Sequence, residues 1–458
     1  MGERHRNEWG ALRAGAGPRG PRATPWSPIL LALLLVNIIL FCSAAAVRHQ
    51  PPTSDPVFQK LEAIVKTISE ITGFEQKHAV PYGRMNHDQL RKFLAKRLKA
   101  TLRPEELHAD ELSLKLFGLV PQDFDLKKST VDLLTEQAAA FYDYQEKRLF
   151  ILDTSSLSEE EITLAHELSH ALADQHFNME KFMEEEPAND DENLAHSAVV
   201  EGQATWLMMA YQMKKVGLTP APTPEMLAQA AGNTEASNSQ YPVLDKSPIY
   251  IQRSLLFPYD EGTLFFDAVY RKLGQPAFAR VFTDPPVDSS QILHPDRYFA
   301  HQHATKPPLP AWKPKDKNKE VASGTVGEFD HYMLLFQYDG KEEADRRSPH
   351  LKGGVYKILE VGPAKSPLLE FASEWDSPDQ AQAFFADYQK VLRGKWKTFQ
   401  PSASLESEFS GHAENGYFTV RWSGALITSV EGIQSEEEWT RLVRQQAEAA
   451  NKLVNVSN

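Results

Sequence analysis

Apolar residues recur at helical spacing along much of the chain. Between Val57 and Ile71 they fall three and four positions apart, which predicts an amphipathic helix with one buried face. The same spacing predicts helices over residues 87–102, 105–117, 194–211 and 259–273. The first two thirds of the chain are therefore expected to be mainly helical.

A β-hairpin is predicted within this helical part. Residues 140–144 and 149–152 are typical of strands, and residues 145–147 between them form a tight turn. An extended segment of this kind can hold the backbone of a bound peptide by strand addition. An ordinary sheet hairpin explains the pattern equally well.

The hairpin leads into a helix expected from about residue 159 to residue 176. Ser158 and Glu161 have the spacing of a capping box, which marks a helix start. Leu164, Leu168 and Leu172 then give the helix an apolar face.

The pattern changes from about residue 323, where strands become more frequent. Helices are expected over 328–336, 378–392 and 435–453, and strands over 354–361, 368–373, 408–412, 417–422 and 425–431. The segment 306–322 is rich in proline and lysine, which is typical of a linker. The sequence therefore predicts an α+β fold: a mainly helical domain with a small sheet over 55–305, a linker over 306–322, and a smaller α+β accessory domain over 323–458.

Residues 1–46 have the order of a secretory signal peptide. Arginines precede an apolar stretch that begins at Ile29, and small residues follow with an Ala-x-Ala motif ending at Ala46. We expect cleavage and export to the periplasm, the cell envelope or the medium. The apolar residues 29–47 are also nearly long enough to cross a bilayer, so an uncleaved membrane anchor is the alternative. Cys42 is the one cysteine of the chain and lies in this leader, so the mature chain has no disulfide.

Beyond residue 46 the chain is acidic. It carries 44 basic and 60 acidic residues there, a formal net charge of −16. This charge disfavours nucleic acid as a partner, because a nucleic-acid surface is itself anionic. With 41% hydrophobic and 24% charged residues, the composition is otherwise that of a globular protein.

Candidate chemistry is concentrated in the helix over 159–176. His166 and His170 are four residues apart, about 40° around a helix axis, so both imidazoles can reach one point. This arrangement suits one metal ion. Glu167 follows the first histidine, where its carboxylate can reach a water on that metal without being a ligand.

A tetrahedral zinc ion that keeps one position for water needs a third protein ligand, and two residues compete for that role. Glu201 lies in the middle of the apolar helix over 194–211, where a carboxylate needs a cation. His176 lies six residues after His170, at the place of the third histidine in the metzincin pattern HExxHxxGxxH. Ala173 replaces the glycine that lets the metzincin chain turn back, so the helix should continue and carry His176 away. We favour Glu201.

The neighbouring Gly202 weakens its helix, and we expect it there because another backbone approaches closely.

The runs His166-Glu-Leu-Ser-His170-Ala-Leu-Ala-Asp174-Gln-His-Phe and Val200-Glu201-Gly202-Gln-Ala204 resemble the gluzincin-type zincin metallopeptidases. They are especially similar to uncharacterised exported bacterial proteins with an HELTHALQDQHF-like helix followed by VEGDA. The resemblance extends over roughly residues 55–300. Beyond residue 320 it is thin, because residues 351–356 depart from the Gly-Trp-Gly-Gly-Asp-like run of such relatives.

The resemblance implies a zincin-like domain over 55–305 that holds one zinc ion through His166, His170 and Glu201. It implies that Glu167 is the general base and that Asp174 orients a ligand histidine. Gluzincins use a distal histidine or tyrosine to stabilise the oxyanion, and the candidates, in order of preference, are His294, Tyr259 and Tyr298.

The expected function is that of an exported zinc-dependent peptidase acting on a protein or peptide substrate. The alternative is a zincin-fold protein that has lost turnover and acts as a binding or scaffolding module of the cell envelope. Glu167 favours the enzyme, because a pure binder has no need of it.

Overall fold

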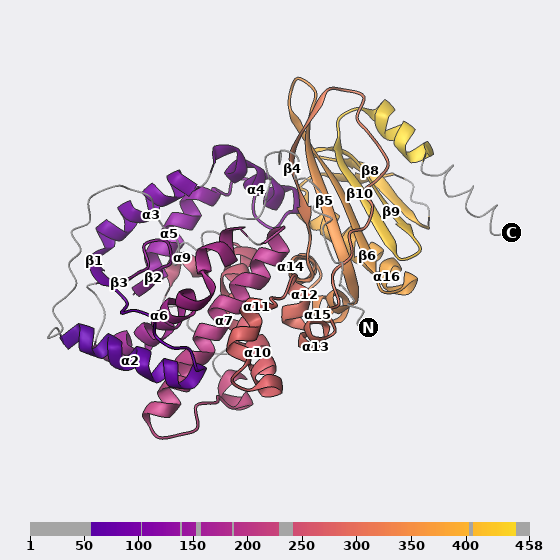
Figure 1. Ribbon diagram of the computed structural model, residues 1–458. Coiled ribbons are helices and arrows are strands. Elements are labelled where there is room, and N and C mark those ends of the chain that lie inside the picture. The colour runs from indigo at the N-terminus through magenta and orange to yellow at the C-terminus, as the bar shows by residue number, and fades with distance from the viewer. Residues whose placement is uncertain are drawn as a thin grey trace, which may run out of the picture.

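The computed structural model describes residues 56–101, 103–137, 140–152, 157–185, 187–228, 241–402 and 406–445. The expected leader over residues 1–46 lies outside these ranges. Within them the chain has an α+β fold, with a helical part and a part built on a large antiparallel sheet (Figure 1). No helix in these ranges combines the length and apolarity needed to cross a membrane.

The helical part contains a small sheet. Its helices are α2 (Pro56–Thr72), α3 (His87–Thr101), α4 (Pro104–Phe117), α5 (Leu126–Gln137), α6 (Leu157–Phe177), α7 (Asp190–Lys215), α9 (Pro242–Asp245), α10 (Ile249–Leu273), α11 (Ala277–Thr283), α12 (Ser289–Leu293) and α13 (Pro295–Phe299). A π-helical turn, η1 (Lys181–Glu185), connects α6 to α7.

The small sheet has three strands in the order β1-β3-β2. The strands β2 (Ala140–Asp143) and β3 (Arg148–Leu152) form the predicted hairpin. The strand β1 (Tyr82–Met85) was not predicted, and it pairs in parallel with β3 from a distant part of the chain. The strand β2 is therefore at an edge of the sheet, next to α6.

Helices α7 and α10 pack against each other at a pair of glycines. A Cβ added to Gly202 would lie 2.1 Å from a backbone atom of Gly262, and a Cβ on Gly262 would lie 2.3 Å from the Ala198 carbonyl oxygen. The expected close approach of a backbone at Gly202 is confirmed. This close contact places α10 directly beside α7, next to the α7 residues that face α6.

The second part contains a seven-stranded antiparallel sheet in the order β4-β5-β6-β10-β9-β8-β7. Its strands are β4 (Asn318–Thr325), β5 (Leu351–Val361), β6 (Ser366–Trp375), β7 (Phe399–Pro401), β8 (Glu408–Ala413), β9 (Gly416–Ser423) and β10 (Leu426–Ile433). The associated helices are α14 (Glu328–Tyr338), α15 (Lys341–Arg347) and α16 (Pro378–Lys395), with a short 3₁₀ turn, η3 (Ser348–His350). The strand β4 begins inside the segment expected as a linker.

The two parts share one hydrophobic core. Phe117 of α4 packs edge-on against Tyr356 of β5 and Phe371 of β6, with ring centroids 5.5 and 5.6 Å apart. Phe329 of α14 packs against Phe257 of α10 at 4.8 Å. The expected boundary between the two parts is thus crossed by closely packed aromatic side chains, which fixes α10 relative to α14.

Candidate metal centre

Helix α6 carries the two histidines of the motif on its buried side. It runs without a break from Leu157 to Phe177, past Ala173, as predicted. His166 and His170 are one turn apart, and their rings meet edge to face with centroids 4.7 Å apart. Both imidazoles therefore point toward the same place, next to α7.

Glu201 of α7 completes a cluster of three donor atoms. The Nε2 atoms of His166 and His170 are 3.0 Å apart, and the Oε2 atom of Glu201 lies 3.1 Å from the first and 3.5 Å from the second. All three side chains are buried, with at most 9% of their surface exposed. Residues from two helices thus converge on one point.

The donor set fits a zinc ion. Ligands about 2.1 Å from a tetrahedral zinc ion lie roughly 3.4 Å from one another, close to the separations in the cluster. One proton can be shared between two imidazole nitrogens at this distance, but the nitrogen that accepts it then faces the Glu201 oxygen without a proton to offer, whereas a cation would satisfy all three donor atoms. Nitrogen, nitrogen and carboxylate oxygen are also a set that catalytic zinc sites use.

The charge of the cluster favours a bound cation. Burial alone would raise the pKa of Glu201, but His170 and His166 together outweigh burial, and the pKa is lowered below its usual range. Glu201 is therefore a carboxylate that stays ionised in an apolar helix, where a positive partner stabilises it.

Glu167 lies beside the three donors. Its Oε2 atom accepts a 2.7 Å hydrogen bond from the backbone N–H of Tyr142 in β2. Burial raises the pKa of Glu167 to about 7, and the neighbouring Glu201 also raises it, while His166 and the Tyr142 N–H oppose the increase. The side chain is thus held in place from the edge strand and can exist in either protonation state near neutral pH.

Tyr259 of α10 is the predicted oxyanion candidate that reaches the cluster. Its ring stacks on the ring of His166, with centroids 6.0 Å apart. Burial, followed by the charges of Glu201 and Glu167, raises its pKa well above the usual value, so its hydroxyl adjoins both carboxylates. This position lets Tyr259 support the Glu201 carboxylate.

The other two oxyanion candidates are engaged elsewhere. The Nε2 atom of His294 lies 2.7 Å from Glu328 of α14, in a cavity on another flank of α10. The hydroxyl of Tyr298 donates to the Asp284 carbonyl oxygen at 2.8 Å. The structure does not bring either residue into the cluster, so Tyr259 replaces His294 as the first candidate.

Asp174 differs from its expected role. Instead of orienting a ligand histidine, its carboxylate accepts hydrogen bonds of 2.8 Å from the Tyr142 hydroxyl, Lys147 Nζ and the Met179 N–H. The β2–β3 hairpin packs on this turn of α6 and supplies two of these donors. Asp174 therefore fixes the hairpin to the helix, and with it the Tyr142 N–H that holds Glu167.

The alternative third ligand, His176, points away from the cluster. Its Nε2 atom lies 2.8 Å from the Glu75 carbonyl oxygen, and its ring stacks on Phe74. His196 of α7 also lies outside the site, because its Nδ1 atom faces the Phe182 carbonyl oxygen at 2.9 Å.

The sequence pointed to the hairpin but not to Tyr142 itself. This residue contacts Glu167 through its backbone and Asp174 through its hydroxyl. The available signal was the predicted strand over 140–144 ahead of the motif helix, because a strand that lies at a sheet edge has unpaired N–H groups.

A second acidic group in the described part of the chain is already neutralised. Asp339, Glu343 and Asp387 lie close together, but Lys390 binds Asp339 and Asp387, and Arg347 binds Asp387 at 3.0 Å. A metal ion would have to displace these cations. The cluster of His166, His170 and Glu201 is therefore the better metal site.

Comparison with known proteins gives no relative: no family model matches the chain, and no curated protein or solved structure is significantly similar to it.

Proposed function

We propose that this protein is a zinc-dependent peptidase. The observation that carries the proposal is the convergence of the His166, His170 and Glu201 donor atoms within 3.5 Å of one another. In this proposal these residues hold one zinc ion. When bound, zinc acts as a Lewis acid that lowers the pKa of a water molecule and polarises a carbonyl group.

Glu167 serves as the general base and acid. It accepts a proton from the water that attacks the peptide carbonyl, and it then delivers that proton to the leaving amine. Its position supports this role, because it adjoins the donor cluster and the Tyr142 N–H fixes its carboxylate. A metal-binding scaffold would need no carboxylate at this place.

The edge strand β2 gives a place for an extended substrate. All four residues of β2 align with β3, and the Tyr142 N–H donates to Glu167 and not to β3. In an antiparallel ladder the backbone groups of Ala140 face the same way as the Tyr142 N–H. The residues of β2 are buried, so a peptide chain that pairs with this edge would displace what covers it and present a carbonyl to Glu167. A protein or peptide is therefore the substrate class we propose.

We propose further that the enzyme acts outside the cytoplasm, either released or held by its amino-terminal segment. This part of the proposal rests on the order of charged, apolar and small residues over 1–46.

Metal analysis combined with a peptide library tests the function. The full chain and its Glu167→Gln variant should each contain one zinc ion, and only the unchanged protein should cleave peptides. If both bind zinc and neither cleaves any peptide of a broad library, the protein is a zincin-fold binding or scaffolding module. If neither binds zinc, the proposed centre is wrong.

A further inference from the structure

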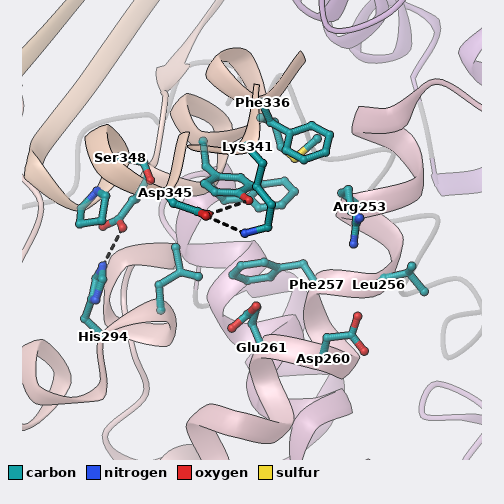
Figure 2. A pocket seen from close by; sticks show the side chains of 16 residues that line it. Arg253, Leu256, Phe257, Asp260, Glu261, His294, Phe336, Lys341, Asp345 and Ser348 are labelled. Atoms are coloured by element: carbon teal, nitrogen blue, oxygen red, sulfur yellow. Dashed lines mark hydrogen bonds and ion pairs between the residues drawn. The ribbon is translucent and has the colours of Figure 1, made fainter. Parts of the chain in front are cut away.

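A cavity of about 600 Å³ lies between α10 and the α14–α15 pair. Figure 2 shows its two sides: Phe257, Asp260 and Glu261 on α10, and Phe336, Lys341 and Asp345 on the facing elements. The volume is in the range of sites that hold small molecules or single side chains.

The cavity is separate from the candidate metal centre. Glu261 and Phe257 are each two residues from Tyr259, which places their side chains about 200° around α10 from it. Tyr259 stacks on His166, so the cavity opens on nearly the opposite flank of the helix. A ligand bound there would not contact the three donor atoms.

One wall of the cavity is aromatic. Phe257 and Phe329 pack with ring centroids 4.8 Å apart, and Tyr332 stacks on Phe336 at 6.0 Å. The guanidinium of Arg253 lies 5.9 Å from the centre of the Phe336 ring, so one aromatic face of this wall already makes a cation–π contact. Aromatic faces attract cations and also cover an apolar stem.

In the described part of the chain, the charged residues around the cavity leave the Glu261 carboxylate without a paired cation. Asp345 is bound by Lys341 at 2.6 Å, and Glu328 is bound by Arg297 at 2.7 Å. Among the residues that the structure describes, no cation pairs with Glu261; His294 acts on it electrostatically, but that ring is bound to Glu328. Glu261 is half-buried, so a positive group beside it would replace lost hydration.

We propose that this cavity binds an organic cation: a protonated primary amine on an apolar stem, such as a lysine side chain or an arylalkylamine. The ammonium group pairs with Glu261, and the stem lies against Phe257, Phe329 and Phe336. The acidic residues of the lining, Asp260, Glu261, Glu328 and Asp345, outnumber its two basic residues, Arg253 and Lys341, which disfavours an anion.

Calorimetric titration with phenethylammonium chloride at neutral pH tests the proposal. The full chain should bind this amine, and it should bind the neutral isostere 2-phenylethanol at least about tenfold more weakly. Equal affinity for the two compounds, or no heat with the amine at low millimolar concentration, would overturn the proposal. This comparison needs no variant protein.

Three variants locate the binding. Glu261→Gln should weaken phenethylammonium binding about tenfold and leave 2-phenylethanol unchanged, whereas the nearby exposed Glu342→Gln should change neither. His166→Ala, which disrupts the metal centre, should leave the amine affinity unchanged. Loss of binding in His166→Ala, or retention in Glu261→Gln, contradicts the proposal. None of these outcomes depends on peptidase activity, so the cavity and the proposed function can fail separately.

Discussion

The backbone N–H of Tyr142 donates a 2.7 Å hydrogen bond to Oε2 of Glu167. A strand residue thereby fixes the proposed base without contributing a side chain to the chemistry. The same tyrosine binds Asp174 through its hydroxyl, so one residue of β2 joins the hairpin to α6 at two points.

This relationship predicts the effect of shortening Glu167. Glu167→Asp keeps the charge but withdraws the carboxylate by one methylene, which breaks the bond to Tyr142 and misplaces the base. We expect kcat for peptide cleavage to fall about a hundredfold or more, with unchanged zinc content. Steady-state kinetics with metal analysis checks this, and near-normal activity of the variant would show that Glu167 is not the base.

Tyr259→Phe distinguishes two roles for the tyrosine: support of the Glu201 carboxylate and stabilisation of the oxyanion. Because its hydroxyl adjoins the Glu201 carboxylate, we expect zinc affinity to fall about 10- to 100-fold, with kcat largely restored at saturating zinc. A competition titration with a zinc chelator measures the affinity. A loss of kcat that persists at saturating zinc, with normal affinity, would instead assign Tyr259 to the oxyanion.

Gly202→Ala tests the contact between α7 and α10. Alanine favours a helix over glycine by about 1 kcal/mol, but its Cβ would lie 2.1 Å from the backbone of Gly262. Overpacking should dominate, so we expect the free energy of unfolding to fall by about 1–3 kcal/mol. Urea denaturation checks this.

The control is Gly83→Ala, where the added methyl would lie 3.3 Å from the Phe150 ring. It should cost less than Gly202→Ala. Equal stability of Gly202→Ala and the unchanged protein would mean that the two helices are not packed this closely.

Glu370 of β6 predicts a pH dependence of stability away from the metal centre. Burial raises its pKa to about 7; the charge of Lys357 lowers this pKa and the charge of Glu320 raises it. The native state therefore keeps the proton that the unfolded chain loses near pH 4.5, and this group's contribution to stability decreases as the pH rises from about 4.5 to 7.

Glu370→Gln should accordingly stabilise the protein at pH 8, by about 2 kcal/mol, and change little at pH 4. Denaturation at the two pH values measures the difference. A destabilised variant at pH 8 would contradict the raised pKa.

The sequence was most informative where one residue constrains the backbone strongly. Ala173 in place of glycine predicted that α6 continues past it, and the helix does continue to Phe177. Gly202 predicted a close backbone, which is that of Gly262. The helices with clear apolar spacing and the β2–β3 hairpin also followed from local pattern.

The features that the sequence did not predict depend on distant partners or on exposed surface. The strand β1 is four residues long and acquires its structure by pairing with β3. The strand β4 begins with exposed polar residues, because it is an edge strand, so its composition was that of a linker. Asp174 had the right helical spacing to reach a histidine, but its carboxylate accepts hydrogen bonds from Lys147 and Tyr142 instead.

The most direct test of the proposed centre is a crystal structure of zinc-loaded protein with anomalous data at the zinc edge. The account predicts one peak about 2.0–2.2 Å from Nε2 of His166, Nε2 of His170 and a carboxylate oxygen of Glu201. A zinc ion bound by His176 with Glu201 turned away, or no peak at this cluster in zinc-saturated crystals, would contradict it.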